Sequence, residues 1–247
     1  MITRSSLVAY SELLAQISEL AQRDIATVLY QLRGASAETI EEAIIELYPS
    51  IADRYSAASA VVAAEFYDSI RQAQLGRGIL TILADPQTVD SYLTSAYWSL
   101  DGDDITDRLM TSMDRHVRRG SQDTMLANIF NDYERPRWAW VPMNATPCAW
   151  CTLIASRGFD FSKAGIESMY EKRHDNCKCE IVPSWETSPR VEGFDRERFL
   201  KIYEDSYDEE SGDVSLKRRR GESSSDYRRR IETNRLMSRM RKAIKAQ

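Results

Sequence analysis

Residues 148–179 read CAWCTLIASRGFDFSKAGIESMYEKRHDNCKC, and this one stretch holds all four cysteines and one of the two histidines of the chain. The ligand-type residues form two short groups, Cys148-x-x-Cys151 and His174-x-x-Cys177-x-Cys179. Two such groups joined by a loop of roughly 20–25 residues are a common sequence form of a zinc site. Thiolate and imidazole ligands also select zinc over magnesium or calcium. The pattern therefore predicts one local metal centre.

Five candidate ligands compete for the four positions of a tetrahedral zinc ion. The Asp-Asn pair between His174 and Cys177 favours a turn that brings these two side chains together. In an extended chain the sulfurs of Cys177 and Cys179 stand roughly 6–7 Å apart, so a bend is needed before both bind one ion. An all-cysteine set with His174 outside it stays open, and either set fills the site, which makes the expected zinc structural. The preferred set is Cys148, Cys151, His174 and Cys177, with Cys179 as the substitute.

Disulfides are the competing explanation for the cysteine cluster. Residues 1–6 lead directly into an amphipathic stretch without the apolar core of a signal peptide, so we expect synthesis in the cytosol. Thiols stay reduced there. Metal binding is therefore preferred, and oxidation after release of the protein inside a particle stays an alternative.

A fixed order of motifs runs through residues 138–185: C-x-x-C, Ser156-Arg157-Gly158, H-x-x-C-x-C and Val182-Pro183. This order resembles the MuF-like minor head proteins of tailed bacteriophages, in the form found in phages of actinobacteria. The resemblance implies a low-copy virion protein, made in the host cytoplasm and placed inside the head near the portal, that assists head assembly and DNA packaging or delivery. Its implied partners are the portal protein and the major capsid or scaffold protein.

Relatives of this form are also labelled capsid maturation proteases, so an enzymatic function is the alternative. Only His116 and His174 could serve as an imidazole base. His174 is assigned to the metal, and His116 lies in a strongly basic run, which predicts a solvated helix face. The sequence contains neither a G-x-S-x-G turn nor an H-E-x-x-H motif. A non-enzymatic function is therefore favoured, and no catalytic residue is assigned.

The fold class expected is mainly α: a long-helix bundle at residues 1–135, then a small α+β zinc-stapled module, then a basic helical tail. Apolar residues recur every three to five positions over residues 7–32 and 51–70, as on one face of a helix. Shorter helices are expected over residues 86–100 and 105–133.

Composition supports this expectation. Glycine (10) and proline (7) are scarce, which favours long helices. Thr39-Ile-Glu-Glu42 has the form of a capping box that opens a helix, and Pro49 is expected to interrupt it or to open the next one. No run approaches the roughly 18 apolar residues that span a bilayer, so no membrane contact is expected.

The module is expected at residues 136–189. Alternating tryptophans predict a short strand from Trp138, and a helix is expected over residues 148–156. A second strand is expected at residues 159–161. Because so small a module buries little apolar area, metal binding should supply much of its folding free energy.

Charge separates the remainder into an acidic linker (residues 190–215) and a basic tail (residues 216–247), although the whole chain carries only −5. The tail holds twelve Lys or Arg against three Asp or Glu, with an apolar stripe at helical spacing. It could fold back on the linker, dock on an acidic groove of the portal or scaffold, or contact packaged DNA without sequence preference. The candidate contact residues are Lys217, Arg218, Arg219, Arg220, Leu236, Arg239, Met240, Arg241 and Lys242.

Overall fold

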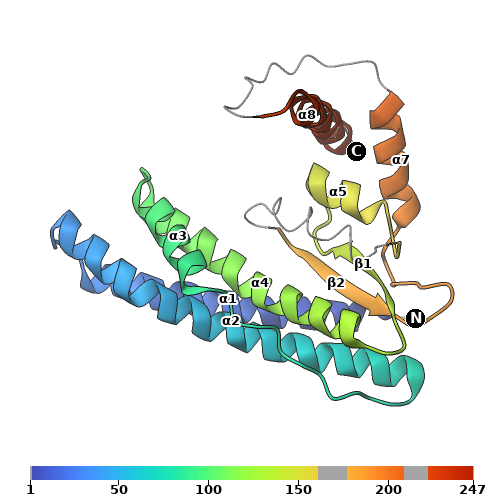
Figure 1. Cartoon of the computed structure of the whole chain (residues 1–247), viewed down its shortest axis with the longest axis horizontal. Helices are drawn as coiled ribbons and strands as arrows, with labels where there is room; N and C mark the ends of the chain where they lie inside the picture. Colours follow the sequence, from blue (N-terminus) through green and yellow to red (C-terminus); the bar gives the residue numbers. More distant parts are fainter. Residues whose placement is uncertain (1, 161–176, 209–221, 247) are drawn as a thin grey trace.

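The computed structural model describes residues 2–160, 177–208 and 222–246. Long helices and one small sheet make up this part of the chain (Figure 1), so the mainly α prediction is confirmed. The elements in chain order are α1 (Arg4–Gln31), α2 (Ala37–Leu75), α3 (Val89–Leu100), α4 (Ile105–Asn131), β1 (Arg137–Pro142), α5 (Ala149–Ala155), β2 (Cys179–Ser184), α7 (Arg196–Asp208) and α8 (Ser224–Lys245).

Helix α2 begins earlier than the predicted capping box. The Ser36 hydroxyl accepts the backbone N–H of Thr39 at 3.2 Å, which makes Ser36 the N-cap and puts Thr39 in the first turn. A serine hydroxyl in this position satisfies one of the N–H groups that a helix start leaves without a partner. The predicted start at Thr39 is therefore wrong by one turn.

Pro49 lies inside α2 and does not interrupt it. A proline in a helix interior costs about 3 kcal/mol relative to alanine. Its neighbours Tyr48, Ile51 and Ala52 are buried in a core shared with α1, α3 and α4. Packing of this apolar face outweighs the propensity of one residue, so the predicted break is wrong.

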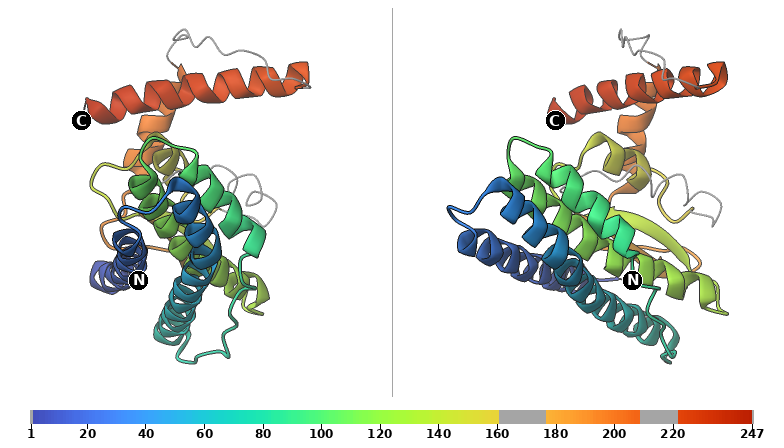
Figure 2. Two further views of the ribbon diagram at one scale, coloured as in Figure 1. Left: turned by 90° about the vertical axis from the view of Figure 1, so that its left-hand side faces the viewer. Right: turned by 60° about the vertical axis from the view of Figure 1, so that its left-hand side comes forward.

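The four N-terminal helices form a bundle in which α2 and α4 pack along each other and α1 and α3 flank them (Figures 1 and 2). One apolar core fills the part of the bundle that contains α3. A second core continues from α1, α2 and α4 into the sheet, where it includes Trp138 and Ile181. Bundle and module therefore share a hydrophobic core.

Gly120 sets the distance between α4 and α2. A Cβ atom at this position would lie 2.3 Å from the backbone oxygen of Ser56. Gly120→Ala is expected to lower the free energy of unfolding by about 1–3 kcal/mol, because backbone must move and the better helix propensity of alanine does not compensate. Urea denaturation measures the change, and the exposed substitution Thr106→Ala serves as control, with an effect within about 0.5 kcal/mol. Equal midpoints for the two variants would contradict the close approach.

The strand predicted from Trp138 is confirmed as β1, and it pairs with a strand, β2, that was not predicted. Strand β2 pairs with β1 in antiparallel register, with Arg137 opposite Ser184 and Pro142 opposite Cys179. All six residues of β2 are buried. The second strand expected at residues 159–161 is wrong, because the chain turns at Gly158 (φ 61°) and Phe159 and Asp160 form no strand; Phe161 lies outside the described residues.

The expected acidic linker contains a packed helix. In α7, Phe199 and Ile202 are buried, and Ile202 joins a small apolar cluster with Ala149 of α5 and Met237 and Met240 of α8. Helix α8 thus lies over α5 and α7, on the side of the module away from the bundle (Figure 2). None of the described helices is long and apolar enough to cross a membrane.

Candidate metal centre

The first cysteine group caps helix α5. Cys148 is its N-cap, with extended backbone, and its sulfur accepts the backbone N–H of Cys151 at 3.3 Å. Cys151 lies in the first turn and is buried. An N–H group and the positive end of a helix both stabilise a thiolate. The start of α5 therefore provides a backbone N–H for the sulfur of Cys148.

The second group brings its sulfurs to the same point. The sulfur of Cys177 lies 3.4 Å from that of Cys151. The ligand atoms of Cys151, Cys177 and Cys179 all lie within 4.8 Å of one another. Sulfurs bound to one zinc at 2.3 Å stand roughly 3.8 Å apart in a tetrahedron. Three thiols are therefore close enough to hold a metal ion.

The pKa values of the clustered thiols are raised. Contacts with the sulfurs of Cys148, Cys177 and Cys179, followed by burial, raise the pKa of the Cys151 thiol. For Cys179, contact with Cys151 lowers the pKa. Contact with Cys177 and burial raise it by more, so the pKa of Cys179 is raised overall. Without a metal ion, these crowded and buried thiols therefore resist ionisation. A divalent cation would favour the thiolate form by pairing with the negative sulfurs.

The structure groups the predicted ligands differently from the preferred set. Cys179, the predicted substitute, lies inside the group of three, and Cys148 lies beside it as the cap of α5. His174 lies outside the described residues. All four cysteines are described and no disulfide joins them. Among the described residues, Cys151, Cys177 and Cys179 form the group of three, and the choice between Cys148 and His174 as a further ligand stays open.

Helix α4 of the bundle holds the second cysteine group in place. The side chain of Gln122 donates to the backbone oxygen of Cys179 at 3.0 Å, and Met143 donates its backbone N–H to Lys178 at 2.9 Å. The sequence pattern did not identify Gln122, because its contact partner is 57 residues away. The cysteine cluster is therefore anchored from both the module and the bundle.

The Ser156-Arg157-Gly158 motif has a structural role at the end of α5. Gly158 adopts φ 61°, and a Cβ atom there would lie 2.7 Å from the side chain of Arg196. Arg196 in turn donates to the backbone oxygen of Ser156 at 3.0 Å. A glycine is thus required for α7 to attach at the C-terminal end of α5.

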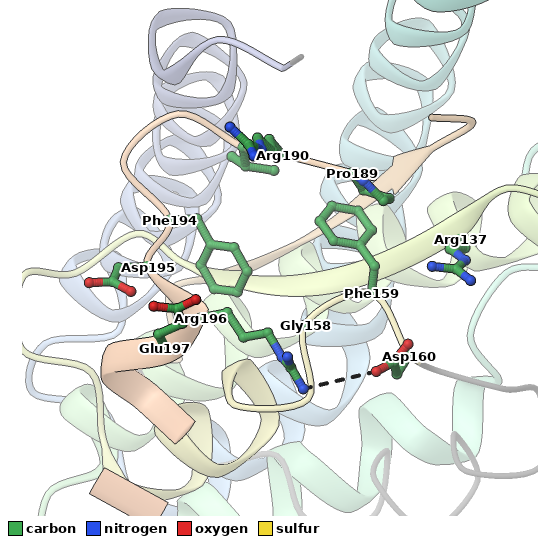
Figure 3. Close-up of a pocket in the computed structure, with 11 residues that line it drawn as sticks. Arg137, Gly158, Phe159, Asp160, Pro189, Arg190, Phe194, Asp195, Arg196 and Glu197 are labelled. Atoms are coloured by element: carbon green, nitrogen blue, oxygen red, sulfur yellow. Dashed lines mark ion pairs between the residues drawn. The ribbon is translucent and has the colours of Figure 1, made fainter. Parts of the chain in front are cut away.

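An open hollow of about 580 Å³ lies beside this attachment (Figure 3). The rings of Phe159 and Phe194 line it. Its charged groups balance, so it has no net charge with which to select an ion, and the cysteine cluster is the stronger candidate site. These charged groups are Arg137, Arg190, Arg196, Asp160, Asp195 and Glu197.

His116 is buried, so the prediction of a solvated histidine is wrong. Its ring forms two hydrogen bonds, one between Nδ1 and Gln87 Oε1 (2.7 Å) and one between Nε2 and Ser95 Oγ (2.9 Å). These partners satisfy the ring in the core and allow the otherwise basic helix to bury it. Burial, reinforced by Arg115 and Arg119, lowers the pKa of His116 from 6.5 to about 3.

The pKa of His116 predicts loss of stability in acid. The unfolded chain takes up a proton near pH 6.5 and the folded chain only near pH 3, so stability falls as pH drops through this window, by up to about 1.4 kcal/mol per pH unit. In His116→Gln the slope between pH 6.5 and 4.5 should be shallower, because glutamine does not titrate. Urea denaturation of both proteins across this range measures it. Parallel pH profiles would contradict the prediction.

The candidate contact residues of the tail divide into three groups. Lys217, Arg218, Arg219 and Arg220 lie outside the described residues. Met240 is fully buried and Leu236 is half-buried against α5 and α7, so the apolar stripe is already covered within this chain. The exposed basic positions are Arg241 and Lys242, with Arg239 half-buried.

Comparison with known proteins gives the family. The model of the VG15 protein family matches residues 1–206, which is most of the chain, and the chain therefore belongs to this family. VG15 is a family of phage virion genes, so the chain is a phage virion-associated protein. Searches of curated proteins and of solved structures found no match.

Proposed function

We propose that this chain is a minor head protein of a tailed bacteriophage, located inside the head near the portal, where it assists head assembly and DNA packaging or delivery. The observation that carries the proposal is the gathering of Cys151, Cys177 and Cys179 at one point, in the motif order that resembles MuF-like proteins. Membership of a phage virion family supports it. The portal protein and the capsid or scaffold protein are the proposed partners.

Structural zinc is the metal proposed for the cysteine cluster. Thiolate donors fit zinc, and Cys148 supplies a fourth sulfur beside the group of three. With four protein ligands no position is open for water, so the ion would fix α5 to the start of β2. His174 stays the alternative fourth ligand.

The protease alternative receives no support from the buried histidine. A general base works best with a pKa near the working pH, whereas that of His116 is about 3. Its Ser95 partner is also buried, and the second ring nitrogen faces Gln87, an uncharged group. Heads assembled with His116→Ala should therefore still contain processed scaffold or major head protein if processing occurs; loss of processing would revive the alternative.

Cryo-EM of portal-containing heads tests the proposed location. Density matching the helical bundle on the inner side of the portal is the expected result. Phage that lack the chain should form fewer DNA-filled heads, and the intact gene supplied in trans should restore them. Density outside the head, or normal yields of filled heads without the chain, would overturn the proposal.

The exposed basic face of α8 is proposed to contact packaged DNA. Arg241, Lys242 and Lys245 are exposed, while the apolar face of α8 packs on α5 and α7. Replacing these three residues with alanine is expected to weaken binding to a double-stranded oligonucleotide and to reduce the salt dependence, by about one unit of slope per lost phosphate contact. Fluorescence anisotropy at several salt concentrations measures it, and Lys201→Ala on the exposed side of α7 is the control. Unchanged DNA binding by the triple variant would contradict the proposed DNA contact and would leave this face to solvent or to a protein partner.

A further inference from the structure

A buried ion network connects helix α4 to the cysteine cluster. Arg118 donates through Nε to Asp114 at 3.1 Å and through Nη1 to Glu180 at 3.4 Å. Glu180 also accepts a hydrogen bond from Ser11 of α1 at 2.9 Å. The side chains of Arg118 and Glu180 are 7% and 1% exposed, so water screens their charges little.

This network lies next to the metal ligands. Glu180 follows Cys179 directly in β2. Burial raises the pKa of Glu180, and Cys177 adds to this rise; burial lowers the pKa of Arg118, but Glu180, Asp114 and, to a smaller extent, Cys177 raise it. One helical turn beyond Arg118, Gln122 donates to the backbone of Cys179. Residues four apart share one face of a helix, so the same face of α4 contacts the cysteine segment twice.

The charges in the network do not balance. Arg118 is the cation of the network and faces two carboxylates, those of Asp114 and Glu180. Zinc displaces the protons of its thiol ligands, so a site with three or four thiolates and one Zn²⁺ carries a charge of −1 or −2. A buried negative group needs an opposite charge close by.

We propose that Arg118 is the counter-cation of the zinc–thiolate centre and that Glu180 opposes it, so that the charge of the bundle sets the affinity of the module for zinc. This inference rests on the proposed zinc site. Arg118 acts as a positioning and charge-compensating residue and binds no metal itself. The bundle thereby controls the metal occupancy of the module through charge as well as through the shared hydrophobic core.

The zinc affinities of three single variants test the proposal. Arg118→Met should weaken zinc binding by about tenfold or more, and Arg118→Lys, which keeps the charge, should stay close to the wild type. Glu180→Gln should strengthen zinc binding, because it removes a negative charge and keeps the hydrogen-bonding shape. Opposite signs are decisive, since a merely structural ion pair would weaken binding whichever partner is changed.

The measurement is competition between the full-length protein and a chromophoric chelator at pH 7.5. Cobalt spectra show whether the thiolate ligand set is unchanged, and circular dichroism shows whether each variant is folded. If Arg118→Met does not fold, the double variant with Glu180→Gln replaces it, and an affinity near the wild type is expected. Weaker zinc binding in both Arg118→Met and Glu180→Gln, or no change in either of them, overturns the proposal. Absence of zinc binding in the wild type would instead overturn the zinc site itself.

Discussion

Removal of zinc is expected to lower the melting temperature by about 10–20 °C, which corresponds to a loss of roughly 5 kcal/mol for a chain of this size. The reason is that the sulfurs of Cys151, Cys177 and Cys179 converge from two segments, and the ion would be their crosslink. Purified protein should contain about one zinc per chain. Cys151→Ser should reproduce the effect of a chelator, because it removes a ligand from either candidate set.

Controls make the zinc prediction specific. Thr152→Ser changes a buried neighbour in the same helix without touching a sulfur, and it should leave metal content unchanged. Comparison of Cys148→Ser with His174→Gln identifies the fourth ligand, since the one that loses metal binds it. Protein without zinc, with its four thiols oxidised in pairs, would contradict the metal centre.

The cysteine cluster could be predicted from spacing because ligand chemistry restricts which residues bind one ion. The choice among the five ligands could not, because it depends on backbone direction. Cys177 precedes β2 and Cys179 begins it. The sulfurs of both residues nevertheless lie close to that of Cys151. An extended segment would have separated them.

Contacts between residues far apart in the chain explain why β2 and the burial of His116 were not predicted. Strand β2 has no alternating pattern, because both of its faces are buried, and its partner β1 lies far away in the chain. His116 is surrounded in sequence by arginines, and only Gln87 and Ser95, from other segments, make its burial possible. Periodicity reports one face of one element, so it predicted the bundle helices and missed these contacts.

Helix α8 packs in the way that one of the three expected alternatives described, namely back on the linker. The apolar stripe was recognised, and the tail was expected to fold back on the linker, to dock on a partner or to contact DNA. The structure covers it with α5 and α7 of the same chain, where Met237 and Met240 are buried. The stripe is therefore part of the fold, and the exposed residues Arg241, Lys242 and Lys245 lie outside it.

The second large effect is expected from the buried ion pair between Arg71 and Asp132. Arg71 of α2 donates to Asp132 at 2.8 Å, and both side chains are 0% exposed. The hydroxyl of Tyr67 donates to the same carboxylate at 2.9 Å, and its ring contacts Trp185 at the end of β2. This pair therefore ties the ends of α2 and α4 to the sheet.

Asp132→Ala should cost about 3–5 kcal/mol, because it leaves the Arg71 charge buried without its carboxylate. The control is Asp123→Ala, which removes the partner of Arg119 in a partly exposed pair and should cost less than about 1 kcal/mol. Urea denaturation of both variants gives the comparison. The double variant Arg71→Met with Asp132→Leu should recover part of the loss, since it removes both charges and keeps apolar volume. Equal stability of the two single variants would contradict the burial of the Arg71–Asp132 ion pair.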